Sequence, residues 1–172
     1  MTRAEAKALY LRYLGEATIN GSPRDDPDFS DLFDALLYPA IVQVAALYPS
    51  RETLCVERRL EAPEDLVAIT RTFDETGAPV AYTRVGERTF FFDAPCTAEY
   101  TRRPSAPGEE NDAVLDLDER AAQLVPIQIA IHAAAASPEH AWQVPYLTAS
   151  YNALHAALDA QHAVTFRRVN AV

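Results

Sequence analysis

The chain has 172 residues, 49% of them hydrophobic and 23% charged, a composition typical of a folded domain and unlike that of a disordered chain. Its formal net charge of −10 excludes a broad nucleic-acid-binding surface, because such a surface needs clustered cations. Cys55 and Cys96 belong to no C-x-x-C pair, so we expect two reduced cysteines in the core or the sheet. No signal-type run and no stretch of about 18 apolar residues occurs, so we expect a soluble, cytoplasmic protein that does not engage a membrane.

The first part of the sequence predicts two helices. Thr2 and Glu5 form a capping-box pair, so we expect a helix over residues 3–18, with apolar positions at three- and four-residue spacing. The turn-forming stretch NGSPRDDP follows. A second helix over residues 26–48 carries a wide apolar face, and Pro39 inside it predicts a kink, because proline removes a backbone hydrogen bond.

Residues 53–103 change to a period of two and predict an antiparallel meander of four or five strands. Within it, Asp74–Gly77 and Gly86–Glu87 are typical of hairpin turns, with a two-residue loop at the second. Three consecutive aromatic residues place rings on both faces of one strand: Phe90, Phe91 and Phe92. We interpret one face as packed on the helices and the other as covered by a neighbouring chain, which predicts a subunit interface. Burial of both faces within the chain is the alternative.

The segment Arg103–Asp112 ends the sheet region with two prolines and an acidic run. Pro104 and Pro107 cannot donate to a strand ladder, and the segment is longer than ordinary hairpin loops. We therefore expect an exposed loop that is mobile or ordered by a partner. A merely solvated connector is the alternative. Its acidic residues are Glu109, Glu110 and Asp112.

The last part predicts two more helices, over residues 118–136 and 138–161. Asp118 is a candidate cap for the first, in which Pro126 either bends the helix or marks its first turn. The stretch Ser137–Glu139 offers a cap followed by proline at the first helical position of the second. An alanine run at the end of the third helix adds little volume, so the two helices can approach closely.

The C-terminal residues 162–172 are β-prone and basic, and we expect an extended arm. About ten extended residues reach roughly 30 Å, far enough to leave the subunit and add to a sheet edge of a partner. Its cations would complement an acidic partner surface. Folding back as an edge strand on its own sheet is the alternative. The side chains expected to dock are Val164, Phe166, Arg167, Arg168 and Val169.

The sequence contains no recognisable catalytic constellation. The four histidines form no H-x-x-x-H or H-E-x-x-H pattern, no G-x-S-x-G occurs, and no glycine-rich phosphate loop is present. We therefore expect no metal, no cofactor and no enzymatic activity. A small enzyme stays open as a less favoured alternative.

Together these elements predict an α+β fold: a single domain over residues 1–161 with a bundle of about four helices and an inserted antiparallel β meander, and an extended C-terminal arm. The order helix, helix, meander, long loop, helix, helix and tail resembles the head-to-tail adaptor (connector) proteins of tailed bacteriophages. The stretches that carry the resemblance are LYLRYLGEATING, DLFDALLYPAIVQVAALYP, APEDLVAI, AEYTRRP and LVPIQIAIHAAAASPEHAWQVPYLTASYNALHAAL.

The resemblance implies a structural protein of the virion neck, present in the host cytoplasm during assembly. Such proteins form a ring, usually dodecameric, between portal and tail, and line the channel through which DNA leaves the head. The implied partners are the portal protein, a tail or other neck protein and further copies of the chain, with the C-terminal arm docking on the portal. DNA would pass without specific binding, since an acidic wall repels phosphate. A helix-plus-sheet protein-interaction module of the cytoplasm is the main alternative.

Overall fold

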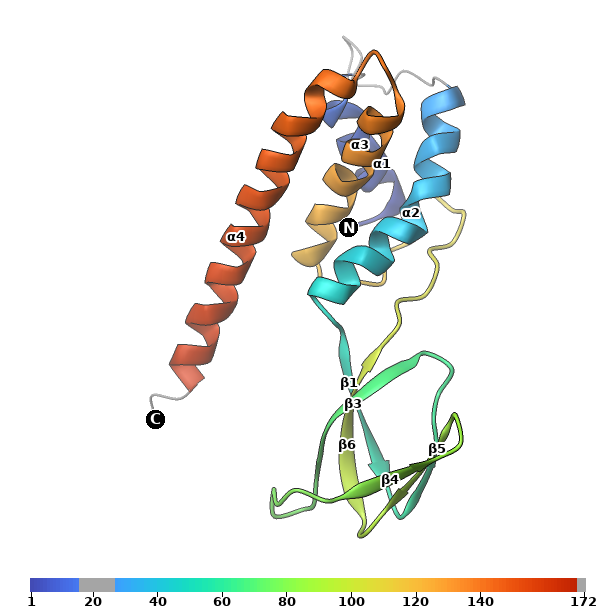
Figure 1. The fold of residues 1–172 in the computed structure, drawn as a ribbon, viewed down its shortest axis with the longest axis vertical. Coiled ribbons are helices and arrows are strands. Elements are labelled where there is room, and N and C mark those ends of the chain that lie inside the picture. Colours follow the sequence, from blue (N-terminus) through green and yellow to red (C-terminus); the bar gives the residue numbers. More distant parts are fainter. Residues whose placement is uncertain (16–26, 170–172) are drawn as a thin grey trace. The chain divides into compact units, whose positions relative to one another are not determined.

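The computed structural model describes residues 1–15 and 27–169 (Figure 1). The chain divides into two compact units. Met1–Ala46 and Ala106–Val172 form the first, which we call the helical unit, and Leu47–Ser105 form the second, which we call the sheet unit. The fold is therefore mixed helix and sheet, as the α+β prediction states at this level.

The helical unit contains α1 (Arg3–Tyr13), α2 (Pro27–Leu47), the 3-10 turn η1 (Ala121–Gln123), α3 (Leu124–Ala136), the 3-10 turn η2 (Ala141–Gln143) and α4 (Val144–Val169). The sheet unit contains β1 (Arg51–Val56), β2 (Arg59–Glu61), β3 (Leu66–Phe73), β4 (Tyr82–Val85), β5 (Thr89–Phe92) and β6 (Cys96–Arg102).

The start of α1 confirms the predicted capping box. The Thr2 hydroxyl accepts a hydrogen bond from the Glu5 backbone N–H at 3.2 Å, and the Glu5 carboxylate accepts one from the Thr2 N–H at 2.8 Å. The helix ends earlier than predicted, at Tyr13, because Gly15 adopts a φ of +79°. This left-handed conformation is the usual helix stop, and only glycine adopts it without steric cost. Residues 16–18 of the predicted helix lie outside the described part of the chain.

The centre of the helical unit is α3, which packs against both α1 and α4. Two alanines of its alanine run, Ala133 and Ala134, are buried, where their small side chains allow a neighbouring helix to approach closely, while Ala135 and Ala136 are exposed. Helices α1 and α2 contact each other through the Tyr10 and Phe33 rings, whose centroids lie 5.5 Å apart. Each large apolar side chain buried in this core contributes about 1.5–3 kcal/mol relative to an exposed position.

Helix α2 continues through Pro39, and the kink expected there stays a prediction. Phe29–Leu47 is the one helical stretch of the described residues long and apolar enough to cross a membrane. A helix in the core of its own domain has the same composition, and three side chains of α2 are fully buried within the chain: Phe33, Ile41 and Val44.

The last two helices begin later than predicted. Asp118 caps the turn before α3, accepting a hydrogen bond from the Arg120 N–H at 3.0 Å, but the α-helix itself begins at Leu124. Pro126 then falls in its first turn, where a missing N–H costs nothing. Helix α4 likewise begins at Val144, so that Pro145 falls in its first turn. Residues 138–140 form a turn instead of the predicted helix start.

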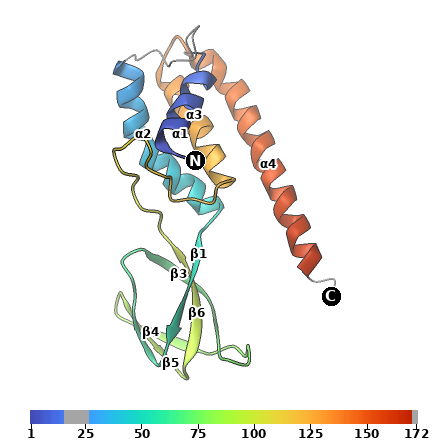
Figure 2. The ribbon, with the colours of Figure 1, turned by 180° about the vertical axis from the view of Figure 1, so that it is seen from behind.

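The predicted extended arm is wrong for residues 162–169, because α4 continues to Val169. No proline or glycine occurs between Gln161 and Val169 to stop the helix. The β-branched residues there lower helix propensity by only a few tenths of a kcal/mol each. Figures 1 and 2 show α4 running beside α3 and then continuing well beyond it. Residues 170–172 lie outside the described part.

The predicted consecutive meander is also wrong. The sheet unit has six strands in two three-stranded antiparallel sheets, with strand orders β1-β6-β3 and β2-β5-β4. The last strand, β6, therefore lies between the first and the third. The two sheets share one apolar core, whose buried residues are Val56, Ala62, Val80, Phe90, Phe92, Cys96 and Ala98.

Two turns of the sheet unit depend on glycine. In the turn after β3, Gly77 has a φ of +85°, and the Asp74 carboxylate accepts hydrogen bonds from the N–H groups of Thr76 and Ala78 at 2.8 and 2.9 Å. This turn matches the prediction. The β4–β5 hairpin pairs Val85 with Thr89, so its loop has one residue more than the predicted two.

Candidate functional surfaces

The predicted phenylalanine interface is divided between the core and the surface. Phe90 and Phe92 are buried, with 6% and 4% of their surface exposed, and the Tyr82 ring packs on both at 5.9 and 5.6 Å. Phe91 points to the opposite face and is 43% exposed. The Arg59 guanidinium lies 5.8 Å from its ring centre. Only Phe91 is thus available to a partner, and its place in a subunit interface stays a prediction.

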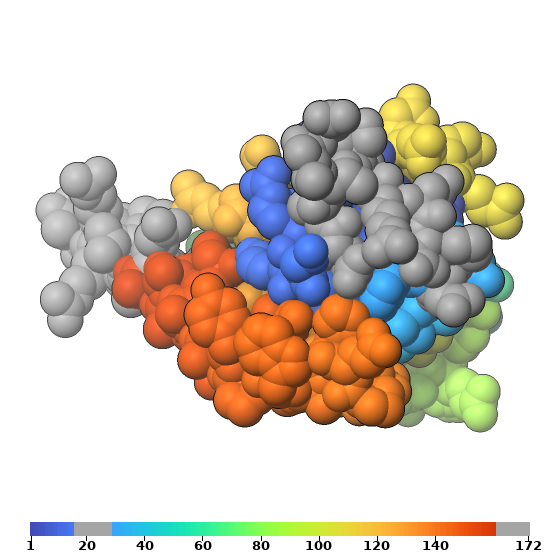
Figure 3. Space-filling model, turned by 90° about the horizontal axis from the view of Figure 1, so that it is seen from above, coloured from blue at the N-terminus to red at the C-terminus, as the bar shows by residue number. Residues whose placement is uncertain are grey.

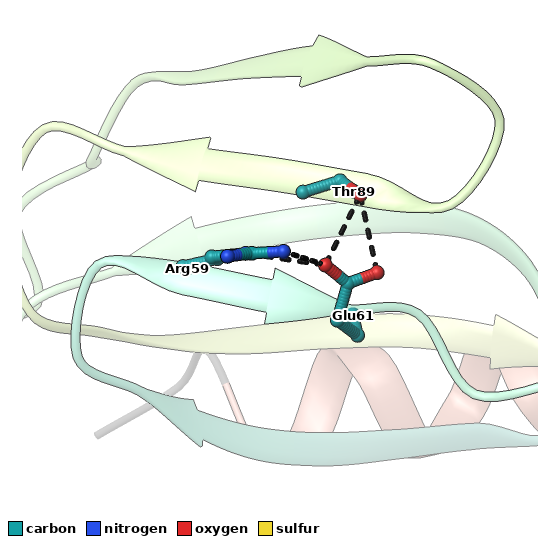
Figure 4. A network of polar contacts seen from close by, with 3 residues as sticks. All are labelled: Arg59, Glu61 and Thr89. Atoms are coloured by element: carbon teal, nitrogen blue, oxygen red, sulfur yellow. Dashed lines mark hydrogen bonds and ion pairs between the residues drawn. The ribbon is translucent and has the colours of Figure 1, made fainter.

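The outer face near Phe91 carries a polar network on β2 and β5 (Figure 4). Glu61 accepts hydrogen bonds from the Arg59 guanidinium and from the Thr89 hydroxyl, the latter at 3.1 and 3.2 Å. These hydrogen bonds, that of Arg59 first, hold the pKa of the Glu61 carboxyl below its usual value. The network fixes an ionised carboxylate at the surface of a short strand.

The acidic residues of the loop, Glu109, Glu110 and Asp112, are exposed as expected. The backbone around them is nevertheless held by the start of α1. The Arg3 N–H donates to the Ala113 carbonyl at 2.8 Å, and the Ala4 N–H donates to the Asn111 carbonyl at 3.0 Å. The Arg3 guanidinium also donates to the Gly108 carbonyl at 3.2 Å. The loop therefore satisfies free N–H groups of the first helical turn.

The predicted docking residues of the C-terminus occupy the last turns of α4, at backbone positions 164 and 166–169. On a helix, positions 162–169 extend over about 12 Å, far less than the extended arm would reach. Their docking role stays a prediction, now for a helix end instead of a strand.

An exposed aromatic pair on the helical unit was not singled out from the sequence. Trp142 in η2 is 75% exposed, and Tyr146 in the first turn of α4 is 71% exposed. We call this pair the aromatic tip. In the view from above, Figure 3 shows the atoms of η2 and the first turns of α4, in orange, on the surface of the molecule. Apolar residues recur along α4 at three- and four-residue spacing, at positions 147, 151, 154 and 158, and Leu147 and Leu158 are buried. Trp142 and Tyr146 lie outside this series, and that is the sequence signal that could have identified them as exposed.

A groove in the sheet unit was also not foreseen. It has a volume of about 530 Å³ and lies between the first half of β3 and the β4–β5 hairpin. Its apolar lining includes Val67, Ile69, Tyr82 and Phe90, and its charged rim consists of Glu64, Arg84, Glu87 and Arg88. Val67 is 61% exposed and Tyr82 41% exposed, so the groove presents apolar surface to solvent.

Within the described residues, no group of three or more His, Cys, Asp or Glu side chains could hold a metal ion. Three histidines make local contacts instead. His132 Nε2 lies 3.0 Å from the Gln128 side-chain nitrogen, His140 Nδ1 lies 3.3 Å from that of Gln143, and His155 Nδ1 lies 3.2 Å from the Asp159 carboxylate.

Charge is unevenly divided along the chain. Residues 47–105 hold eight arginines and ten acidic residues, a net charge of −2, so the remainder carries −8 of the total of −10. The helical unit is therefore the acidic part of the protein.

No protein-family model matches the chain, and no curated protein matches it.

Proposed function

We propose that the chain is a structural subunit of a head-to-tail adaptor ring of a tailed bacteriophage. In this role it binds the portal protein on one side and a tail or other neck protein on the other, and its copies surround the channel through which DNA leaves the head. It acts without catalysis and without a cofactor. Its place would be the virion neck, and the host cytoplasm during assembly.

The observation that carries the proposal is the aromatic tip. A tryptophan and a tyrosine with more than two thirds of their surface in water are costly on a protein that works alone, and such residues are enriched at the centres of protein interfaces. Their position at one end of the helical unit, together with exposed Phe91 on the sheet unit, gives the chain two separate apolar surfaces. A closed ring built from side-to-side contacts needs two different surfaces on each copy.

The uneven charge supports the same role. A net charge of −8 on the helical unit would repel phosphate, so that DNA passing a ring of such units would not be retained. In this arrangement the helices form the ring wall, and the C-terminal part of α4, which continues beyond α3, is the element that docks on the portal.

Trp142 is the only tryptophan of the chain, and its fluorescence can therefore test the proposal directly. The full chain is purified and mixed with the portal ring encoded in the same genome, and the mixture is examined by native mass measurement and electron microscopy. We expect ring-shaped complexes with many copies of the chain, together with a blue shift of Trp142 emission and protection from iodide quenching. The double variant Trp142→Ser/Tyr146→Ser removes the aromatic tip, and it should remain folded but assemble poorly.

A protein that never joins portal rings, and that stays a monomer or dimer under all these conditions, contradicts the proposal. That result would favour the interaction-module alternative, for which the open groove of the sheet unit is the specific observation.

A further inference from the structure

We infer that the groove of the sheet unit is an acceptor for one extended strand of a partner polypeptide, with apolar side chains at alternate positions and a carboxylate next to Arg84. This inference does not depend on the proposed function, since a strand acceptor can serve any partner. It follows from the divergence of β3 and β4, which lie close together only near the turn that joins them.

The two strands are joined at one end only. At the end of β3, the Val80 N–H donates to the Thr72 carbonyl at 3.2 Å, and the Thr72 hydroxyl donates to the Val80 carbonyl. Further from this junction, β3 pairs only with β6 and β4 pairs only with β5. The facing edges of β3 and β4 therefore have no strand between them, and the groove lies along this gap.

A strand edge is a row of backbone N–H and C=O groups that can be satisfied by another strand. Here two such edges line the same groove, so one inserted strand can bond to both. Neither edge is protected by proline or lysine: β3 has the sequence LVAITRTF and β4 has YTRV. Proline and lysine are two of the means by which proteins block unwanted pairing, and bulges are a third, which β3 does have: its register against β6 shifts between Leu66 and Ala68 and between Ile69 and Arg71. The four residues of β4 pair with β5 without such a shift, so β4 offers the more regular edge to an added strand.

The floor of the groove selects apolar side chains on one face of the strand. Tyr82 and Arg84 point into the groove with Phe90, since Tyr82 contacts the Phe90 ring and Arg84 is the cross-strand partner of Phe90. Thr83 and Val85 point to the other side of β4. An inserted strand beside β4 would thus direct one set of alternate residues toward the groove lining that includes Tyr82 and Phe90, and the intervening residues toward solvent.

Charge complementarity decides the chemistry at one end of the groove. The Arg84 guanidinium donates to the Gly86 and Glu87 carbonyls and lies 5.8 Å from the Phe90 ring centre, but no described carboxylate forms an ion pair with it. Arg88, by contrast, is paired with Glu64 at 3.7 Å. Arg84 is therefore the rim cation that a carboxylate on the incoming strand would complement.

The test uses the full chain and three capped eight-residue peptides, followed by backbone amide chemical shifts. The first peptide alternates threonine and valine between two terminal aspartates, so either strand direction places a carboxylate near Arg84. The second has lysines in place of the aspartates. The third keeps the aspartates but has two central prolines, which cannot pair as a strand.

We expect saturable shifts of the amides of Leu66–Ile69 and Tyr82–Val85 with the aspartate peptide, weaker binding of the lysine peptide and no binding of the proline peptide. The variant Arg84→Gln should weaken the aspartate peptide about threefold to fivefold and abolish the preference over lysine. Arg71→Gln is the matched control, since Arg71 also lies over an aromatic ring, that of Phe73, but outside the groove. It should leave binding unchanged.

Three results would overturn the inference: no saturable shift with any peptide, shifts confined to residues outside β3 and β4, or equal binding of the proline and aspartate peptides. Failure of ring assembly with the portal, by contrast, leaves the acceptor intact, so the two proposals fail separately.

Discussion

The rings of Tyr10 and Phe33 lie 5.5 Å apart and join α1 to α2, yet the Tyr10 hydroxyl is buried without a hydrogen-bond partner among the described residues. The ring contributes apolar contact, while no described residue forms a hydrogen bond with the buried hydroxyl. This division makes the two halves of one side chain act in opposite directions on stability.

The substitution Tyr10→Phe should therefore leave the helical unit as stable as before or more stable, by up to about 1 kcal/mol. Phe33→Ala, which removes the opposing ring, should cost about 3–5 kcal/mol. Urea unfolding followed by far-ultraviolet circular dichroism measures both. A loss of more than about 1 kcal/mol in Tyr10→Phe would mean that the hydroxyl is bonded.

Two buried tyrosines also predict alkaline instability. Burial raises the pKa of Tyr10 and of Tyr100 to about 12, and at Tyr100 a hydrogen bond to Glu52 adds to the effect. Because the folded pKa lies above the unfolded value of 10.0, the neutral hydroxyls favour folding fully below pH 10, and this contribution is lost as pH rises toward 12. Unfolding free energies measured across this window should fall, and should fall less in Tyr10→Phe. An unchanged slope in the variant would exclude Tyr10 as a cause.

The turn after β3 should depend on glycine at one position. Gly77 has a φ of +85°, and no atom lies within 4 Å of the position that a Cβ would take. The cost of a side chain is therefore backbone strain alone, so Gly77→Ala should destabilise the sheet unit by about 1–2 kcal/mol. Asparagine tolerates this conformation better, and Gly77→Asn should recover part of the loss. Equal stability of all three proteins would show that the turn relaxes to another conformation.

Removal of residues 162–172 separates docking from folding. Leu158 is the last buried position of α4 among the residues whose side-chain burial the structure describes, so we expect a chain ending at Gln161 to keep its unfolding free energy within about 0.5 kcal/mol. Its helical signal should fall in proportion to the lost turns of α4. If the proposed function holds, the shortened protein no longer joins portal rings. Loss of thermal stability with docking retained would assign this helix end to the core.

The sequence predicted local structure well where one or two residues decide it. Thr2 and Glu5 were sufficient for the start of α1, and Asp74 with Gly77 for the turn after β3. Pro126 and Pro145 also mark true first turns, but the capping residues upstream of them form 3-10 and other turns, which placed the predicted helix starts too early. In both places a capping residue and a later proline each indicated a helix start, and the proline marks the start of the α-helix correctly.

Features that depend on distant pairing could not be obtained in this way. Alternation in the sequence identified strands, but nothing in it placed β6 between β1 and β3, since that order is decided by packing of the whole unit. The groove is a consequence of that order and of the divergence of β3 from β4, so it too was invisible. At the C-terminus the error has a different cause. Residues 162–169 have a β-prone sequence, but they directly follow a formed helix, and α4 extends through them to Val169.

The chain enters the sheet unit through β1 and leaves it through β6, and these two strands pair with each other. Arg51 on β1 is opposite Thr101 on β6, and the Arg102 N–H donates to the Ser50 carbonyl at 3.2 Å. The two ends of this insertion are thus about one strand spacing apart, roughly 5 Å. A segment whose ends meet behaves as an exchangeable cassette: it can be shortened, enlarged or replaced, and the host needs only a short bridge to close the gap. The sheet unit can accordingly be replaced as a whole, while the helices before and after it in the chain keep their sequence.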